Sequence, residues 1–591
     1  MKTSFLIAAI AGLALAGFLP AAGAATFVVN TTFDSQDVVL GDGLCGDTVG
    51  ACSLRAAISE ANAFAGPDVI TLPAGIYTNT LVAANEDNNL GGDLDINSDI
   101  TINGANSATT IVQAATTAGV ASERVFHMRY SGPKVLNDLT VRHGRLTGSV
   151  FGAGLLVEAG TVVVTLNRVV IANNEGGANG GGLAISSGNA SITTLNLCRV
   201  ENNTTGSMVS GPSNGAGVLF LGATATLNIN DSIITGNAIS NMGIASAAGI
   251  YSDGILNITN SVVSNNTATS SGSSTFAGGI SIIGGTTTIL GSTISGNVST
   301  VTGGGGSGFA GGISSQDATL VLANSVVSGN TASRFHAGIR TIALNAPSTT
   351  TITNSTISDN TAALDGGGVI NFSGGLETAT TNITGSTVRG NHANGPTNIG
   401  GGLENFHSST GTAVINVTNS TVSGNIAARG AGSHNSGNSA SINFNFSTIA
   451  GNTATVSGGG ILQATAGATN LKSSIVGDNA APAGPDISGI VTSMGYNLVE
   501  NVSGGTFVPL AGDITGTDPQ LGPLANNGGS TTTHRPGPSS LAIDAIPTGT
   551  SECGVAVTTS QNGLSRPQQA GCDKGSVEVN PELIFRNGFD E

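Results

Sequence analysis

Tryptophan is absent from this 591-residue sequence, and only 4 residues are tyrosine. Aromatic side chains offer broad apolar surfaces with polar edges, so their scarcity argues against an aromatic platform for sugars. Charged residues make up only 9% of the chain, which argues against charge-driven disorder. The 89 glycines argue equally against a bundle of ordinary helices.

Positive charge is also scarce. The chain has 18 Lys and Arg against 35 Asp and Glu, a net charge of −17 and a pI near 4.6. Nucleic-acid phosphates would repel such a chain, and no basic cluster reverses this locally. We therefore expect no nucleic-acid partner.

Cysteine is scarce as well, with 5 residues in the chain. Cys45 lies close to Cys52, and Cys553 lies close to Cys572, both pairs outside the repeats described below. Two local disulfides, Cys45–Cys52 and Cys553–Cys572, fit an oxidising compartment. Cys198 falls where neighbouring repeats carry serine, which predicts a buried, inert thiol.

Long apolar runs are confined to the start of the chain. Lys2 precedes an apolar run over residues 5–19, and Pro20 and small residues follow it. This pattern predicts a signal peptide over residues 1–24, with cleavage near Ala24. About 15 apolar residues are short for a membrane span, and no later segment offers roughly 18, so we expect no transmembrane span in the mature chain.

A repeat dominates the remaining sequence from about residue 150. Each copy has a Gly-rich turn, an apolar residue, a Thr-rich strand and the phrase Asn-Ser-x-Ile/Val-x-x-Asn. The closing asparagine recurs at intervals of 27 to 34 residues, at Asn173, Asn203, Asn237, Asn266, Asn297, Asn330, Asn360, Asn391, Asn425 and Asn452. Turns of variable length between strands of constant phase explain that spread.

Within the repeats the apolar residues have a period of two, which is typical of strands. A single coil cannot bury its apolar face, but stacked coils align apolar side chains at strand spacing. The residues expected to point inward are Val263, Ile294, Val327, Ile357 and Val422. The closing asparagines are expected to form a ladder that bonds the amides above and below, because asparagine also tolerates left-handed geometry.

The predicted fold is therefore all-β, a right-handed parallel β-helix (solenoid) with a small helical N-terminal cap and an irregular C-terminal segment. A β-sandwich also has strands at short intervals, but it does not require the same residue type at the same phase of every repeat. About 13 coils at strand spacing would make a rod of about 60 Å.

Particular motifs resemble known families. Residues 45–61, with the sequence C-x6-C-S-L-R-A-A-I-S-E-A, resemble the CSLREA domain of secreted bacterial β-helix proteins and differ from its motif at Ala56, where the family has Glu. This resemblance implies an N-terminal cap and first coil over residues 25–100. Small and apolar residues on one helix face suit a lid over that coil, namely Leu54, Ala57, Ile58 and Ala61.

The remaining resemblances extend to the end of the chain. Residues 100–143, with Ile100-Thr-Ile-Asn-Gly104 and Leu139-Thr140-Val141, resemble the first coils of a pectin-lyase-like β-helix. Residues 150–480 are similar to polymorphic outer-membrane-protein repeats, and together these resemblances imply β-helix repeats over residues 101–490. Residues 491–580, from Asp518-Pro-Gln-Leu-Gly to Cys572-Asp573, resemble the choice-of-anchor Q segment, and residues 581–591 resemble a sorting tail of exported Gram-negative proteins. Repeated prolines after residue 490 argue against a membrane β-barrel. Together these features imply a secreted or outer-surface protein of a Gram-negative-type bacterium.

Candidate catalytic residues are few. If the Gly-rich turns align, Arg340, Glu404 and His434 share one column, interrupted by Ile370. A solvated ladder of mixed charge is the ordinary state of an exposed face. Asp93 and Asp95 offer two ligands, far short of the six to eight that Ca²⁺ takes. We therefore predict no catalytic residue, no metal and no cofactor.

Two functional hypotheses follow from these observations. The first is a non-catalytic, monomeric surface or secreted rod whose Ser/Thr/Asn-rich face acts in adhesion or contacts extracellular polysaccharide or other cell-surface components. The alternative is a polysaccharide lyase or glycoside hydrolase that uses Arg340, Glu404 and His434, and only this alternative brings in Ca²⁺. Resemblance of fold without a matched site does not establish chemistry, so the first hypothesis is preferred.

Overall fold

The computed structural model describes residues 23–83, 86–130, 132–158, 160, 162–186, 190–206 and 211–580. Residues 1–22 of the predicted signal peptide and the whole predicted sorting tail, 581–591, lie outside the described residues. Among the described residues, no helix is both long enough and apolar enough to cross a membrane.

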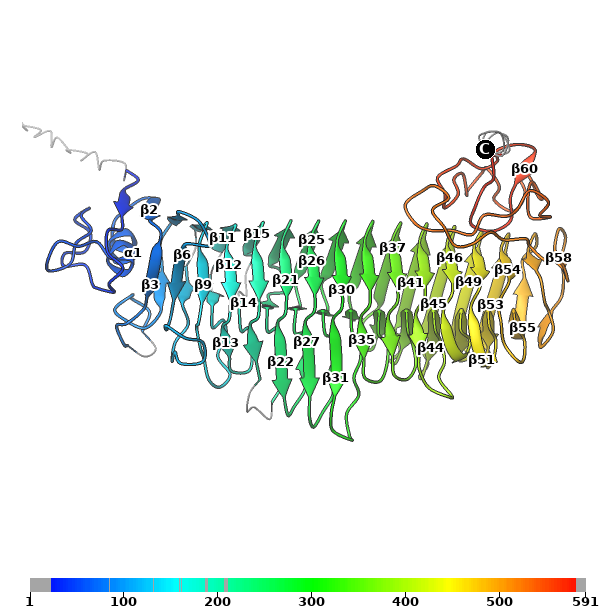
Figure 1. Cartoon of the computed structure of the whole chain (residues 1–591), viewed down its shortest axis with the longest axis horizontal. Coiled ribbons are helices and arrows are strands. Elements are labelled where there is room, and N and C mark those ends of the chain that lie inside the picture. The colour runs from blue at the N-terminus through cyan, green and yellow to red at the C-terminus, as the bar shows by residue number, and fades with distance from the viewer. Residues whose placement is uncertain are drawn as a thin grey trace, which may run out of the picture.

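The chain forms a rod of stacked coils in which nearly every strand pairs in parallel with the equivalent strand of the next coil (Figure 1). Three long sheets and one shorter sheet run along the rod, and we name them A to D. β55 pairs with strands of both sheet A and sheet C, which joins these two into one hydrogen-bonded set of 30 strands. The predicted class, an all-β parallel β-helix, is confirmed, and the β-sandwich alternative is wrong.

The strands of each sheet are as follows. Sheet A contains β1 (Thr26–Val28), β2 (Asp68–Leu72), β5 (Ile100–Gly104), β8 (Gly132–Asn137), β11 (Val162–Asn167), β15 (Ile192–Asn196), β20 (Thr226–Asn230), β25 (Ile255–Thr259), β29 (Thr286–Leu290), β33 (Thr319–Ala323), β37 (Ser348–Thr353), β41 (Thr378–Thr384), β45 (Thr412–Thr418), β49 (Ala440–Asn445), β53 (Ala468–Lys472), β55 (Ile487–Ser493) and β57 (Gly505–Phe507). Sheet B contains β3 (Gly75–Thr78), β6 (Thr110–Gln113), β9 (Thr140–Arg142), β12 (Val170–Ala172), β16 (Arg199–Glu201), β21 (Ile233–Thr235), β26 (Val262–Ser264), β30 (Thr293–Ser295), β34 (Val326–Ser328), β38 (Thr356–Ser358), β42 (Thr387–Arg389), β46 (Thr421–Ser423), β50 (Thr448–Ala450), β54 (Ile475–Gly477), β56 (Leu498–Val499) and β58 (Ile514–Thr515). Sheet C contains β4 (Leu94–Ile96), β7 (Phe126–Met128), β10 (Leu155–Glu158), β14 (Leu183–Ser186), β19 (Val218–Leu221), β24 (Ile250–Ser252), β28 (Ile280–Ile283), β32 (Ile313–Gln316), β36 (Ile339–Ala343), β40 (Val369–Ser373), β44 (Leu403–His407), β48 (Ser433–Ser436) and β52 (Ile461–Gln463). Sheet D contains β13 (Glu175–Gly176), β17 (Thr204–Thr205), β22 (Ala238–Asn241), β27 (Thr267–Ser270), β31 (Val298–Val301), β35 (Thr331–Ala332), β39 (Thr361–Ala362), β43 (His392–Ala393), β47 (Ile426–Arg429) and β51 (Thr453–Ser457). Two short pairs lie apart from these sheets, β18 (Ser213–Asn214) with β23 (Ala245–Ser246), and β59 (Ile546–Pro547) with β60 (Gly571–Cys572).

One apolar core runs through the stack. The predicted inward residues align from coil to coil, as Val263 does with Ile294 and Val327 does with Ile357, and all of them are fully buried. Burying a side chain of this size stabilises the fold by about 1.5 to 3 kcal/mol. Because each residue contacts its equivalents in the coils above and below, the apolar clusters merge into one continuous core.

A ladder of buried asparagines also runs along the rod, as predicted. The Asn203 side chain donates to Asn237 Oδ1 at 3.0 Å, and the same bond recurs coil after coil until Asn479 donates to Asp486 Oδ1 at 2.9 Å. The left-handed conformation belongs to the residue before each ladder asparagine, such as Asn202 with φ 55°.

The first rung of this ladder was predicted at the wrong residue. Asn174, not Asn173, joins it and donates to Asn203 Oδ1 at 2.9 Å. Asn173 takes the left-handed position with φ 55°, where asparagine is one of the few side chains that fits.

A second ladder explains the position of Cys198. Serine Oγ atoms accept backbone N–H groups from the preceding coil, for example from Ser261 N to Ser292 Oγ at 3.0 Å. The Cys198 thiol occupies the equivalent site and is 1% exposed. Burial raises the pKa of this thiol to about 11, which keeps it protonated.

Helix α1 (Leu54–Ala63) covers the N-terminal end of the core, where the lid was expected. Ser53 caps the helix by accepting from the Ala56 N–H at 3.0 Å, and Ala56 itself is fully buried. The buried Arg55 pairs with Asp34 at 2.7 Å and donates to the Asp93 carbonyl at 2.8 Å. These contacts fasten the helix to the first coil.

The coils continue through β58, beyond residue 490 where the repeats were predicted to end. The chain then folds back as an irregular lobe over the last strands of sheet B, seen in orange and red in Figure 1. Gln561 Nε2 donates to the Ser386 carbonyl at 3.0 Å, and the Thr421 hydroxyl donates to Gln561 Oε1 at 2.7 Å. Both predicted disulfides, Cys45–Cys52 and Cys553–Cys572, are present.

Candidate functional site

The second residue of each strand in sheet C points away from the core, and these residues form one outward column. Strand pairing aligns Arg340 with Ile370, Ile370 with Glu404 and Glu404 with His434. The same pairing continues toward the N-terminus, where Asp95 aligns with His127. The column therefore carries two groups of acidic and basic side chains. The column positions between these groups are uncharged, namely Leu156, Ala184, Leu219, Tyr251, Ser281 and Ser314.

The first group, Arg340, Glu404 and His434, is covered rather than open to solvent. These side chains are 7%, 2% and 4% exposed. The four strands β36, β40, β44 and β48 are each entered through a left-handed residue four positions before the column residue, at His336, Gly366, Gly400 and Gly430. These residues lie on the outer side of the column. Gly400 contacts Glu404 in this way, and Gly430 contacts His434.

Burial shifts the pKa values of all three side chains in this first group. It raises the pKa of Glu404 well above the usual value, lowers that of His434 to about 4 and lowers that of Arg340 to about 9. The Arg340 guanidinium lies over the Phe309 ring at 4.1 Å. Burial therefore favours the protonated form of Glu404 and keeps His434 neutral near pH 7. A sugar would reach these side chains only after the covering turns moved.

The neighbouring aromatic rings do not form a platform for sugars. Phe276, Phe309 and Phe335 stack on one another with centroids 5.9 and 5.7 Å apart. Phe372 and Phe406 stack at 4.5 Å. Because the rings face each other along the rod, their faces are used within the protein.

The second group lies at the N-terminal end of sheet C and surrounds His127. Its Nδ1 atom is 3.3 Å from Asp95 Oδ1 and 3.8 Å from Asp87 Oδ1, and its Nε2 atom is 3.0 Å from Glu158 Oε2. The Arg129 guanidinium lies 2.8 Å from Asp87 Oδ2. This group brings three carboxylates to one imidazole.

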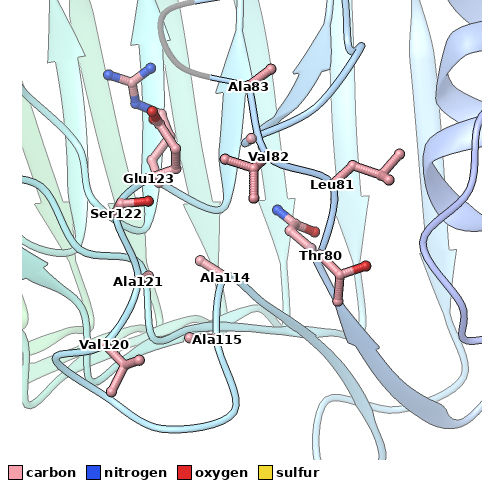
Figure 2. Close-up of a pocket in the computed structure, with 13 residues that line it drawn as sticks. Thr80, Leu81, Val82, Ala83, Ala114, Ala115, Val120, Ala121, Ser122 and Glu123 are labelled. Carbon is pink, nitrogen blue, oxygen red and sulfur yellow. The ribbon is translucent and has the colours of Figure 1, made fainter.

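Two cavities lie at this end of the rod, and one of them is lined by members of the His127 group. One, of about 350 Å³, is lined by Asp93, Glu123, His127 and Glu158 among others. The other, of about 210 Å³, lies between residues 80–83 and 120–123, with Ala114 and Ala115 between them (Figure 2). Burial raises the pKa of Asp93 to about 6, although Arg124 lies 2.9 Å away. This end of the rod therefore combines open volume with a concentration of charge.

Sequence reasoning noted Asp93 and Asp95 but missed His127 and Glu158. The repeat phrase begins near residue 150, so it did not show which residues of the earlier coils are equivalent to one another. A weaker signal was present in the triplets 94–96 and 126–128, each of which has a polar residue between two apolar ones. Aligning these triplets would have placed Asp95 beside His127.

Comparison with known proteins adds little to this description. No protein-family model and no curated protein matches the chain. Among solved structures, the chain is similar to the A-module of mannuronan C-5 epimerase AlgE6 from Azotobacter vinelandii, at 15% identity over 81% of this chain and 100% of that one, with a TM-score of 0.28. A TM-score this low supports no functional conclusion, and the resemblances to the CSLREA and choice-of-anchor Q segments stay predictions.

Proposed function

We propose that this protein is an exported, monomeric and non-catalytic β-helix rod that contacts extracellular polysaccharide or another cell-surface component through sheet A. Its two disulfides favour an oxidising compartment outside the cytosol. We place it in the secreted fraction or on the outer surface of a Gram-negative-type bacterium.

The observation that carries this proposal is an uncharged outward column on sheet A, which we name the Thr/Asn column. Strand pairing aligns its members in the order Thr165, Thr194, Asn228, Asn257, Thr288, Val321, Thr351, Asn382, Asn416, Asn443 and Asn470. All of them are half-buried. Several amides bond one another, for example Asn257 Nδ2 to Asn228 Oδ1 at 2.9 Å.

Such a column suits a partner rich in hydroxyl groups. Hydroxyls and amides both donate and accept hydrogen bonds, and each amide in the Thr/Asn column can form further hydrogen bonds beyond those to its neighbours. Successive rungs lie about 4.8 Å apart, so the groups repeat regularly along the rod. Because the column carries no charge, it favours a neutral polymer over an acidic one.

Binding and cleavage are best tested together on the purified mature protein. It would be incubated with neutral and acidic polysaccharides, with and without Ca²⁺, while retained protein and new reducing ends are both measured. The proposal expects retention without cleavage. New reducing ends that disappear in Glu404→Ala or His434→Ala would overturn it and establish the lyase or hydrolase alternative.

Matched substitutions would locate the binding face. Thr288→Lys combined with Thr351→Lys places two bulky charges on sheet A, and Thr293→Lys combined with Thr356→Lys places the same charges on sheet B of the same coils. All four residues are half-buried. We expect the sheet A pair alone to weaken retention by about tenfold or more, or about 1.4 kcal/mol. Equal retention by both pairs would exclude sheet A as the contact face.

A further inference from the structure

We propose that Asp87, Asp95 and His127 form a binding site for a divalent transition-metal ion of the Zn²⁺ type, with Glu158 as the outer partner of the histidine. One ligand atom from each of Asp87, Asp95 and His127 lies within 4.8 Å of the other two. This inference is independent of the function proposed for sheet A.

Two of the three ligand atoms are buried and have no hydrogen-bond partner among the residues that the structure describes. Asp95 is 0% exposed and His127 is 3% exposed. Asp95 Oδ1 and His127 Nδ1 make no hydrogen bond within the described part of the chain, although they face each other at 3.3 Å. Leaving buried polar atoms unpaired is costly, so two together indicate a ligand between them.

The spacing of the atoms fits the proposed ion. Zn²⁺ binds imidazole nitrogen and carboxylate oxygen at about 2.0 to 2.2 Å in tetrahedral geometry, which places two ligands about 3.3 to 3.5 Å apart. The Nδ1 to Asp95 Oδ1 distance is 3.3 Å, and the Nδ1 to Asp87 Oδ1 distance is 3.8 Å. Asp87 is half-exposed, so a small movement of its side chain would close the site.

The hydrogen bonds around the site prepare each ligand for this role. His127 Nε2 lies 3.0 Å from Glu158 Oε2, and a proton on Nε2 leaves the Nδ1 lone pair free for the metal. A histidine that binds a metal almost always donates its other N–H to a carboxylate, a carbonyl or water. Of the remaining oxygens, Asp95 Oδ2 accepts from the Asn89 N–H at 3.0 Å, and Asp87 Oδ2 forms an ion pair with the Arg129 guanidinium at 2.8 Å.

The N-terminal cap holds one ligand in place. Asn89 Nδ2 donates to the Arg55 carbonyl and the Ser59 hydroxyl of α1, and Asn89 Oδ1 accepts from the Asp95 N–H at 3.2 Å. Helix α1 therefore positions Asp95 through Asn89. Three protein ligands leave one position of a tetrahedral ion free, beside the 350 Å³ cavity that Asp87 and His127 line.

The types of ligand atom at the site indicate which metal ions it would bind. Ca²⁺ takes six to eight oxygen ligands, whereas this site offers a nitrogen and two carboxylates. Imidazole with carboxylates suits Zn²⁺ and its neighbours in the first transition row. Three further carboxylates also approach one another, the exposed Asp478 and Asp518 and the half-buried Glu500. They offer no nitrogen ligand, and none of their oxygens is among the buried unpaired atoms of the described residues.

The test is equilibrium binding of Zn²⁺ to the full mature protein after treatment with a chelator, with Co²⁺ absorption as a second readout of tetrahedral geometry. We expect one ion per chain. His127→Gln and Asp95→Asn should abolish binding, and Glu158→Gln should weaken it about 10- to 100-fold. Glu123→Gln, in the wall of the same cavity, and Asp518→Asn, in the other carboxylate cluster, should bind as the wild type does.

Folding is checked by circular dichroism of each variant. If the two buried substitutions prevent folding, Asp87→Asn supplies the same test, because its half-exposed side chain is not needed to fill the core. The proposal fails if the wild type takes up no Zn²⁺. It fails equally if folded His127→Gln or folded Asp87→Asn binds the ion as tightly as the wild type.

Discussion

Replacing Asn330 with alanine would remove one rung from the middle of the buried asparagine ladder. The Asn330 side chain takes part in four hydrogen bonds: its Oδ1 accepts from the N–H and Nδ2 of Asn297, each at 3.0 Å, and its Nδ2 donates to the Ile294 carbonyl and to Asn360 Oδ1, at 3.0 and 2.9 Å. Alanine leaves those partner groups buried and without these bonds. At about 1 kcal/mol for each bond, the free energy of unfolding should fall by about 4 kcal/mol.

The matched control is Asn257→Ala, which removes one amide bond from the half-buried Thr/Asn column. Water can replace that bond, so we expect a loss of about 1 kcal/mol or less. Thermal and urea unfolding of both variants would measure the difference. Hydrogen exchange in β30, β34 and β38 would report local opening, since a long stack of coils need not unfold in two states. Equal losses in the two variants would refute the role given to the ladder.

Three further predictions concern buried titratable groups. Burial raises the pKa of Asp486, the last rung of the asparagine ladder, to about 7. The stabilising contribution of Asp486 is therefore complete below its pKa in the unfolded chain, near 4, and is lost as pH rises through about 7. Asp486→Asn should flatten this fall in the free energy of unfolding, and an unchanged slope in urea titrations at several pH values would contradict the prediction. The Cys198 thiol should react with a thiol reagent only after unfolding, and rapid labelling of the folded protein would show that the serine-ladder site opens. Because burial raises the pKa of Glu404 and so favours its protonated form, Glu404→Gln should leave polysaccharide retention unchanged and cost little thermal stability at pH 7. A large loss of stability in this variant would contradict that reasoning.

The repeating part of the fold could be predicted from sequence because its constraints recur in every coil. Val263 and Ile294 must meet in the core, and Ser261 must accept from the coil before it, so residue type and phase coincide. The error at Asn173 arose where two asparagines are adjacent. One must be left-handed and the other must face the ladder, and the repeat phrase alone does not say which.

The candidate sites were harder to predict because they depend on what covers a side chain. Pairing aligns Arg340, Glu404 and His434, but the turns that bury them come from left-handed residues such as Gly400, whose path strand periodicity does not describe. His127 and Asp95 lie 32 positions apart in coils that lack the repeat phrase, so only the three-dimensional register brings them together.

The C-terminal lobe changes how load would pass through the rod. A stack of coils without this lobe, if pulled from its last residue, would unfold one coil at a time, because each coil contacts only its neighbours. Here Thr531 bonds the Gly385 carbonyl and Ser576 bonds Thr448, links that span 146 and 128 positions in the chain. A force applied to the lobe is therefore distributed over several coils at once. Unfolding of single coils from this end cannot begin until the lobe has detached from the rod.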